Sequence, residues 1–332
     1  MLAALAVITT TCDKEKDGLG EQNQMFITTS RIGGVVIYAA GSGTMTINWG
    51  DGTNEETHAL QSYDSEWAWE SNQAVFHSYS SGKYHTITII GDNVTHIACP
   101  NEELSYLDVR KNKALEYLSC SYNSLRSLDV SENSMLTQLF CRYNEIKDLD
   151  VSKNTKLEIL FCGETLISSL DVSRNIELSL LNCESSQLIN LDVSKNTKLV
   201  ELQCNSNPLT QLNAGNNPSM TTLVCSDCRL NSLDVSGLTS LTHLECGSYK
   251  DDPDSLSNRI TSLKVNDCIS LSYLNCQNNQ LSREALNSLF ETLNATTISY
   301  GKDILISNNP GANDCDKSIA ENKGWYVTNI FN

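Results

Sequence analysis

The feature that most constrains this 332-residue chain is a row of nine cysteines at nearly constant spacing. They are Cys99, Cys120, Cys141, Cys162, Cys183, Cys204, Cys225, Cys246 and Cys276, and we call them the ladder cysteines. Seven of the eight intervals are 21 residues and the last is 30. A catalytic or metal site needs a few side chains that converge on one point, whereas one position repeated at constant period is typical of a solenoid. The row therefore favours a binding scaffold over an enzyme.

The repeat unit reads L-x-x-L-x-C-x-x-N-x-L-x-x-L-D-V-S-x-N-x-x, as in the segments that begin at Leu115 and Leu136. Its first eleven positions match the leucine-rich-repeat consensus, with Cys where a third Leu or Val is usual. The x-L-x-C-x part alternates with period two, so Leu118 and Cys120 should point inward from a short strand and Tyr117 outward. We expect about nine coils over residues 94–280, with a curved parallel sheet on the concave face and extended or 3₁₀ segments on the convex side.

Free thiols packed in the interior are the favoured interpretation of the cysteines, because these side chains are small, soft and apolar. Neighbouring coils are close enough for disulfides, but parallel side chains in register do not aim their sulfurs at each other. A metal site is less favoured, because the C-x-x-C of Cys225 and Cys228 has no second pair or local His. Cys228 takes the Asn position of its repeat and should be a buried substitute, while Cys268 and Cys315 have no evident partner.

Two polar rows accompany the cysteines. The first follows the strand, and the second follows L-D-V with an aspartate row beside it. Inward amides would satisfy backbone groups, and the aspartates would bond their own turns; stacked calcium sites are the alternative. The first row is Asn123, Asn144, Asn207 and Asn279; the second is Asn112, Asn133, Asn154, Asn175 and Asn196; the aspartates are Asp108, Asp129, Asp150, Asp171, Asp192 and Asp234.

The outward strand positions carry the candidate binding residues. Down the coils they bring together an apolar patch with aromatic and Arg neighbours, a composition that marks interaction hot spots. The patch is Phe140, Ile159, Phe161 and Leu180, flanked by Tyr117, Tyr122, Arg142 and Tyr143. We expect it to bind a protein ligand or a surface component of a host or bacterium, with the 247–260 loop adding selectivity. Alternatively, a terminal segment covers the patch, the chain is a structural spacer, or Tyr117, Tyr122 and Tyr143 stack on a glycan.

Catalysis and cofactors are not expected. His243 and Glu245 share a face and could form an acid–base pair, but no nucleophile, metal set or phosphate loop accompanies them. The net charge of −17, from 23 basic and 40 acidic residues, disfavours nucleic acid and anionic membrane as partners. A monomer is expected.

The flanking segments differ from the repeats. Residues 1–12 read as a lipoprotein signal remnant that ends at the lipidation site Cys12, followed by a linker over 13–23; a truncated ordinary signal or a late start codon is the alternative. No stretch is long enough to span a membrane, so attachment would rest on lipid and the protein would be displayed outside the cell. Residues 24–93 predict a small β-sandwich, in which Asp51 caps its turn or binds Ca²⁺. Residues 281–332 predict an α/β C-terminal cap.

The segments LDVSKNTKLEILFC (Leu149–Cys162) and LDVSKNTKLVELQC (Leu191–Cys204) resemble the repeats of internalin J-like bacterial surface proteins. This resemblance implies a right-handed solenoid with a cysteine ladder, displayed at the cell surface and acting in adhesion. INWGDGT (Ile47–Thr53) and FHSYSSGKYHTITI (Phe76–Ile89) resemble the PKD-like domain of surface proteins, in which the Gly-Asp-Gly hairpin and the His-x-Tyr segment are fold determinants. The Cys12 region and the C-terminal ISNNPGANDCDKSIAENKGWYV resemble surface lipoproteins and leucine-rich-repeat proteins of the Bacteroidetes.

Overall fold

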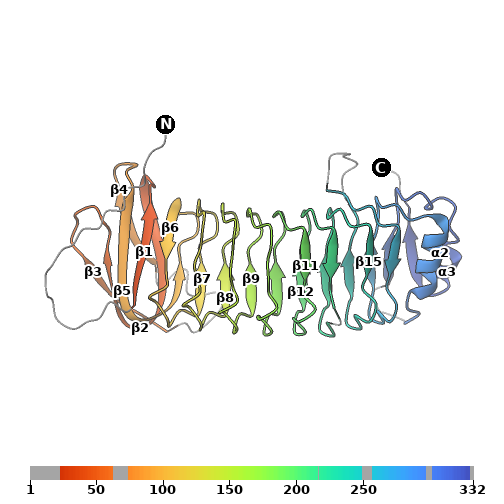
Figure 1. The fold of residues 1–332 in the computed structure, drawn as a ribbon, viewed down its shortest axis with the longest axis horizontal. Helices are drawn as coiled ribbons and strands as arrows, with labels where there is room; N and C mark the ends of the chain where they lie inside the picture. Colours follow the sequence, from red (N-terminus) through yellow and green to blue (C-terminus); the bar gives the residue numbers. More distant parts are fainter. Residues whose placement is uncertain (1–22, 63–73, 216, 249–255, 297–300, 330–332) are drawn as a thin grey trace.

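The computed structural model describes residues 23–62, 74–215, 217–248, 256–296 and 301–329. The described chain forms an elongated stack of turns that follow its long axis (Figure 1). An antiparallel β region lies at the N-terminal end of the stack, and two helices lie at the C-terminal end.

The N-terminal region is a strongly bent antiparallel sheet. Its strands are β1 (Gln24–Thr29), β2 (Gly33–Asn48), β3 (Glu56–Ala59), β4 (Ala74–Tyr79), β5 (His85–Ala98) and β6 (Leu104–Asp108). The first half of β2 pairs with β4, and the second half pairs with β3 and β5. The bend between them requires Gly41, because a Cβ there would lie 1.9 Å from the carbonyl oxygen of Asn93. Bending lets the two halves bury one apolar core that includes Trp49.

The Gly-Asp-Gly hairpin and the His-x-Tyr segment meet in this region. The ring of His77 stacks on Trp49 at 4.6 Å, and its Nε2 lies 2.8 Å from Oδ2 of Asp51. Tyr79 donates its hydroxyl to the carbonyl of Trp49 at 2.7 Å. Asp51 also accepts the backbone N–H of Thr53 at 3.0 Å, so its carboxylate caps its own turn as one of the two alternatives predicted. These bonds with Thr53, together with the one to His77, hold the pKa of Asp51 well below its usual range.

The parallel sheet of the repeats grows directly out of the N-terminal region. The end of β5, His96–Ala98, pairs in parallel with β7, so one strand serves both parts and no break falls at residues 93 and 94. The following strands are β7 (Tyr117–Ser119), β8 (Gln138–Phe140), β9 (Ile159–Phe161), β10 (Leu180–Asn182), β12 (Glu201–Gln203), β14 (Thr222–Val224), β16 (His243–Glu245) and β18 (Tyr273–Asn275). They pair strictly in register, so each residue lies opposite its equivalent in the next turn.

The C-terminal segment continues this sheet. It contains α2 (Arg283–Thr292), β19 (Lys302–Leu305), α3 (Ser318–Glu321) and β20 (Trp325–Thr328), and both strands add in parallel after β18. The solenoid therefore has about eleven turns, against the nine predicted from the cysteines. The two extra turns lack the signature because Ile306 and Asn329 stand where ladder cysteines would be. Neither helix, among the residues the structure describes, has the length and apolarity to cross a bilayer.

The L-D-V half of the repeat is extended, as predicted. Four of its segments form two small parallel pairs on the side opposite the main sheet: β11 (Asn190–Asp192) with β13 (Gln211–Asn213), and β15 (Ser232–Asp234) with β17 (Ser262–Lys264). The aspartates of the L-D-V segments bond their own turns: Asp129 accepts the N–H of Ser131 at 3.0 Å, and Asp150 that of Ser152 at 2.8 Å. These bonds to the serines lower the pKa of both carboxyls.

The interior confirms the cysteine ladder. The ladder cysteines are at most 1% exposed, and each lies one turn above the next. All twelve cysteines of the described chain carry free thiols. Burial raises the pKa of Cys120 and Cys162 to about 12, so neither is a nucleophile at neutral pH. Cys228 is fully buried and its Sγ lies 3.2 Å from the carbonyl oxygen of Cys204, where an Asn amide stands in other turns.

The two asparagine rows differ in how fully they are bonded. Asn144 donates to the carbonyls of Cys120 and Cys141, each at 3.0 Å, and accepts the N–H of Leu125 at 3.0 Å. In the second row, Asn154 donates to Val130 at 3.0 Å and to Asn133 at 2.9 Å. The side-chain oxygens of this second row have no hydrogen-bond partner. Both rows thus tie neighbouring turns together, but the first does so with its whole amide.

Candidate functional site: the outer sheet face

The candidate site is the outer sheet face, which we define as the outward side chains of the parallel strands. The register places Phe140 of β8 opposite Phe161 of β9, and Ile159 of β9 opposite Leu180 of β10. The four patch residues therefore lie on three adjacent turns, as the sequence predicted. Their binding role remains a prediction.

Aromatic rings continue this patch toward the N-terminal region. Phe140 and Phe161 meet edge to face with ring centroids 5.2 Å apart, and Tyr117 lies 5.3 Å from Phe140. On the far side of Tyr117, the ring of His96 stacks at 5.6 Å. Burial lowers the pKa of His96, which favours its neutral form. The result is a continuous row of four rings on four successive turns.

The patch residues are half-buried, and Ser119, although it occupies an outward position of its strand, is only 9% exposed. The physical reason is the strand spacing: parallel strands lie about 4.8 Å apart, so large outward side chains cover the flanks of their neighbours. Phe140 and Phe161 pack edge to face on each other, and both rings stay partly exposed to solvent. Such pre-ordered rings lose little conformational entropy when a partner covers them.

Tyr122 and Tyr143 lie beside this row, on what we call the exit rim: the residues one and two positions after each ladder cysteine. Their rings stack at 4.4 Å and are 54% and 39% exposed. Both have a positive φ, of 60° and 53°. The same left-handed position recurs in other turns, at Asn101, Glu164, Ser185, Ser206, Asp227, Asn278 and Asn308, where every residue except Glu164 has a short polar side chain.

The two tyrosines are unusual at this position. A left-handed backbone costs roughly 1–2 kcal/mol for a residue with a bulky side chain, and less for Asn, whose amide bonds locally. Two successive turns therefore keep a large aromatic residue where the backbone favours a small polar one. Strain that persists at an exposed position is a reason to look for function there.

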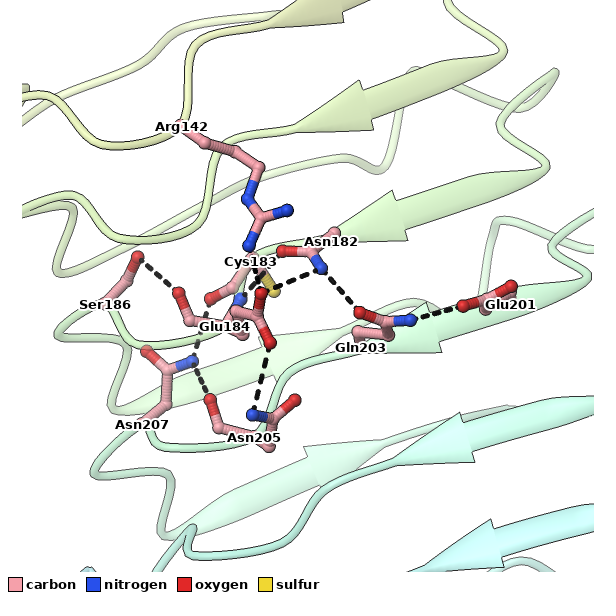
Figure 2. Close-up of polar contacts among 9 residues, drawn as sticks. All are labelled: Arg142, Asn182, Cys183, Glu184, Ser186, Glu201, Gln203, Asn205 and Asn207. Atoms are coloured by element: carbon pink, nitrogen blue, oxygen red, sulfur yellow. Dashed lines mark hydrogen bonds and ion pairs between the residues drawn. The ribbon is translucent and has the colours of Figure 1, made fainter. Parts of the chain in front are cut away.

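Arg142 lies on the exit rim between the aromatic residues and a polar network. Its guanidinium carbon is 5.5 Å from the ring centroid of Tyr143, and its Nη2 forms an ion pair with Glu184 two turns away. Figure 2 shows Arg142 reaching across to Glu184, whose Oε1 also accepts a hydrogen bond from the amide of Asn182 at 3.3 Å. Asn182 donates to Oε1 of Gln203 at 2.6 Å, and Asn205 donates to Oε2 of Glu184 at 3.3 Å. This network fixes the side chain of Arg142.

The network includes residues that the sequence did not single out. Asn182 is 4% exposed, although it occupies an outward position. It tucks over the preceding turn because that turn carries Gly163, where a Cβ would lie 2.7 Å from Oδ1 of Asn182. Gly247 and Asn275 repeat this arrangement, with a Cβ distance of 2.5 Å. The sequence does carry a sign of this arrangement: in both cases a Cys-Gly pair is followed one repeat later by Leu-Asn-Cys. Both the Gly and the Asn fall at x positions of the repeat pattern.

His243 and Glu245 are in contact, with Nε2 and Oε1 2.8 Å apart. The His243 ring also stacks on Tyr273 at 4.3 Å, with an angle of 6° between the rings. The pair is thus bound into the row of outward side chains. Within the described ranges, no cluster of three or more His, Cys, Asp or Glu residues could hold a metal ion.

A groove of about 860 Å³ lies on the opposite side of the solenoid, over β11 and β13. Its lining includes Asp171, Asp192, Asp234 and Lys195. Asp171 and Asp192 each accept the N–H of the serine two positions on, at 2.9 Å. These acids therefore serve their own turns, and the outer sheet face remains the better candidate site.

The predicted signal remnant over residues 1–12, with its lipidation site Cys12, lies outside the described residues, and so does the predicted linker over 13–23 apart from Asn23. Of the 247–260 loop, residues 249–255 are outside, but its end is described: Asn258 donates to the carbonyls of Cys225 and Cys246, at 2.8 and 3.0 Å. Asn258 therefore takes the amide position of the turn, and the repeat resumes its register there.

Comparison with known proteins agrees with this architecture. The chain is similar to the functional domain of InlJ from Listeria monocytogenes, which includes a cysteine ladder, with 28% identity, a TM-score of 0.52 and coverage of 72% of this chain and 56% of that one. The leucine-rich-repeat protein LIC12759 of Leptospira interrogans has a similar fold, with 21% identity, a TM-score of 0.50 and coverage of 64% and 60%. The chain thus spans less than two-thirds of either structure. No protein-family model and no curated protein matches it.

Proposed function

We propose that this protein is a surface-displayed interaction module that binds another protein through the outer sheet face, without catalysis. The observation that carries the proposal is the row of packed aromatic and aliphatic side chains on adjacent turns: Phe140, Phe161, Ile159 and Leu180. Aromatic residues with an adjacent Arg are the composition of interface hot spots. In addition, the leucine-rich-repeat solenoid provides a rigid, extended surface of the kind that repeat proteins use for binding.

The geometry supports a pre-organised site. Arg142 is held by Glu184, and Tyr143 stacks on Tyr122 and lies 5.5 Å from the guanidinium carbon of Arg142. Side chains that are already ordered contribute more of their contact energy to affinity, because less rotamer entropy is lost on binding. The strain at the two tyrosine positions is explained if their rings contact the partner.

A peptide and glycan array screen of the protein, followed by a matched pair of variants, tests this function. Phe140→Ala/Phe161→Ala removes the centre of the patch, and we expect it to weaken binding to the array hits by about 100-fold or more. Ile176→Ala/Ile189→Ala is the control, because these side chains are 54% and 51% exposed and lie outside the outer sheet face. Equal affinity of the wild type and the double Phe variant for every hit would refute the proposal.

Glycan binding is the second candidate, and it rests on the exposed stack of Tyr122 and Tyr143. Their rings cover each other at 4.4 Å with 12° between the planes, so each ring has at most one face left for a sugar. A glycan would also leave the apolar patch uncovered. Array hits that are glycans alone, lost on Tyr122→Ala but retained by the double Phe variant, would favour this alternative.

We also propose attachment through a lipid on Cys12 and display on the outer surface of the cell envelope, with the N-terminal region as a PKD-like domain. The support comes from the sequence: the apolar run before Cys12, the Gly-Asp-Gly and His-x-Tyr segments, and the resemblance to surface proteins. Metabolic labelling with a palmitate analogue tests the attachment. Label that persists in Cys12→Ala would refute it.

A further inference from the structure

Acidic and basic residues of the repeats lie in different places. The outer sheet face and the exit rim are acidic, whereas the turn that leads into each strand is basic. The outward strand positions and the exit rim carry six carboxylates and one guanidinium, a net charge of −6 + 1 = −5. The carboxylates are Glu164, Glu184, Glu201, Asp227, Glu245 and Asp303, and the guanidinium is that of Arg142. Lysine is absent from these positions in the described turns.

The basic residues of the repeats gather instead in the turn that leads into each strand, the S-x-N-x-x segment. This turn carries eight cations and three anions over the repeats, a net charge of 8 − 3 = +5. The cations are Arg110, Lys111, Lys113, Lys153, Lys156, Arg174, Lys195 and Lys198; the anions are Glu132, Glu177 and Asp267. The acidity of the outer sheet face is therefore a local arrangement and not simply a consequence of the net charge of −17.

The acidic and aromatic residues of the exit rim adjoin one another. Glu164 follows Tyr143 by one turn at the same left-handed position. Its carboxylate is close enough that its charge is the largest cause of the raised pKa of the Tyr143 phenol. Arg142 is already paired with Glu184. An approaching cation would meet two tyrosine rings and the Glu164 carboxylate together, which is a favourable environment for lysine or arginine.

From this arrangement we infer that the partner is a protein segment in which lysine or arginine alternates with apolar residues. Its apolar side chains lie on Phe140, Phe161, Ile159 and Leu180, and its cations lie along the exit rim from Tyr143 to Asp227. The inference rests on the proposed function, since it names the chemistry of the partner of the same face. Charge complementarity of this kind adds specificity and speeds association.

Selection from random peptides displayed on phage tests the inference. The protein is the bait, and Phe140→Ala/Phe161→Ala serves in a parallel selection. We expect the enriched peptides to be net positive and to contain apolar residues, and their affinity to fall as salt is added because exposed charges are screened. Enrichment of neutral or acidic peptides would overturn the charge inference.

A matched pair of charge reversals gives the second readout. Glu164→Lys reverses a charge on the exit rim. Asp148→Lys changes the net charge by the same amount, but at an exposed position on the other side of the coil. We expect Glu164→Lys to weaken binding of an enriched peptide about tenfold at low salt and Asp148→Lys to change it less than about twofold. Equal effects of the two variants would overturn the inference.

The outcomes separate this inference from the proposed function. Acidic peptides that require Phe140 and Phe161 would leave the proposed function intact and refute the charge. Basic peptides that bind Glu164→Lys more weakly but bind the double Phe variant unchanged would refute binding through the apolar patch and support the charge inference. If neither the wild type nor the double Phe variant enriches any peptide, both the proposed function and the charge inference are contradicted. Thermal unfolding of each variant shows that it is folded.

Discussion

The inner and outer sides of the same strands follow different rules. In β9, Leu160 points inward and is fully buried, while Ile159 and Phe161 on either side of it are half-buried on the outer sheet face. Inward positions hold nearly the same residue in every turn, because the stack offers the same space each time. Outward positions vary from Phe to Glu to His along the stack. The repeated residues thus determine the fold, and the residues that break the repeat are the candidates for function.

The largest expected effect is a loss of stability at high pH, which comes from the thiols on the inner side of the strands. Burial raises the pKa of the Cys120, Cys162 and Cys276 thiols to about 12. The pKa values of the other ladder cysteines are raised as well, by burial and, at Cys204, first by a hydrogen bond with Cys228. A thiol whose pKa is raised by folding contributes stability that is complete below its unfolded pKa of about 8.5 and is lost as the pH rises toward the folded value. Urea unfolding under reducing conditions should therefore show a steep loss of stability above about pH 8.5.

The size of this loss follows from the number of thiols. Each buried thiol should lose about 1.4 kcal/mol by about pH 9.5, so the nine together approach the whole free energy of unfolding of a typical domain. The double variant Cys141→Val/Cys162→Val should show a weaker pH dependence of the free energy of unfolding, smaller by the contribution of two thiols. A urea midpoint of unfolding that does not change from neutral pH to about pH 10 would contradict a ladder of buried, protonated thiols.

Truncation at adjacent positions of β9 should give opposite results. Leu160→Ala leaves a cavity in the interior and should lower the free energy of unfolding by about 3 kcal/mol, without direct loss of a binding contact. Phe161→Ala removes a half-buried ring and should cost about 1 kcal/mol of stability while it weakens binding. Urea denaturation and affinity for an array peptide measure the two effects. If Phe161→Ala destabilises as much as Leu160→Ala, then the outer sheet face is itself a core.

The two asparagine rows should differ in their contribution to stability. Asn144 uses its whole amide, whereas Oδ1 of Asn154 has no partner. Asn144→Ala strands a buried N–H and several carbonyls, and should cost about 3 kcal/mol; Asn154→Ala should cost about 1 kcal/mol, because it also removes an unpaired oxygen. The difference between the two denaturation midpoints tests this. Equal losses would mean that the oxygens of the second row are satisfied, for example by water.

The sequence predicted what repeats and missed what does not. The position of Cys120, the amide bonds of Asn144 and the Asx turn of Asp129 all follow from the period, since one turn suffices to work them out. The network of Arg142, Asn182 and Glu184 spans three turns, and depends on the side chains of each. The extra strands β19 and β20 carry no ladder cysteine, and the join within β5 depends on a parallel pairing that no motif in the sequence marks. The left-handed rim is periodic, but its φ is evident only in the structure.

The smallest expected effect is also the one that best separates stability from function. Tyr143→Asn places a residue suited to the left-handed backbone, which should gain about 1 kcal/mol, and it loses the stack on Tyr122, worth about 0.5 kcal/mol. The variant should thus be slightly more stable in urea and yet bind more weakly to an array peptide. Ser206→Asn, at the same position three turns on, is the control and should leave binding unchanged. If Tyr143→Asn instead loses stability and keeps full binding, then Tyr143 is a packing residue, and the strain at the rim says nothing about the partner.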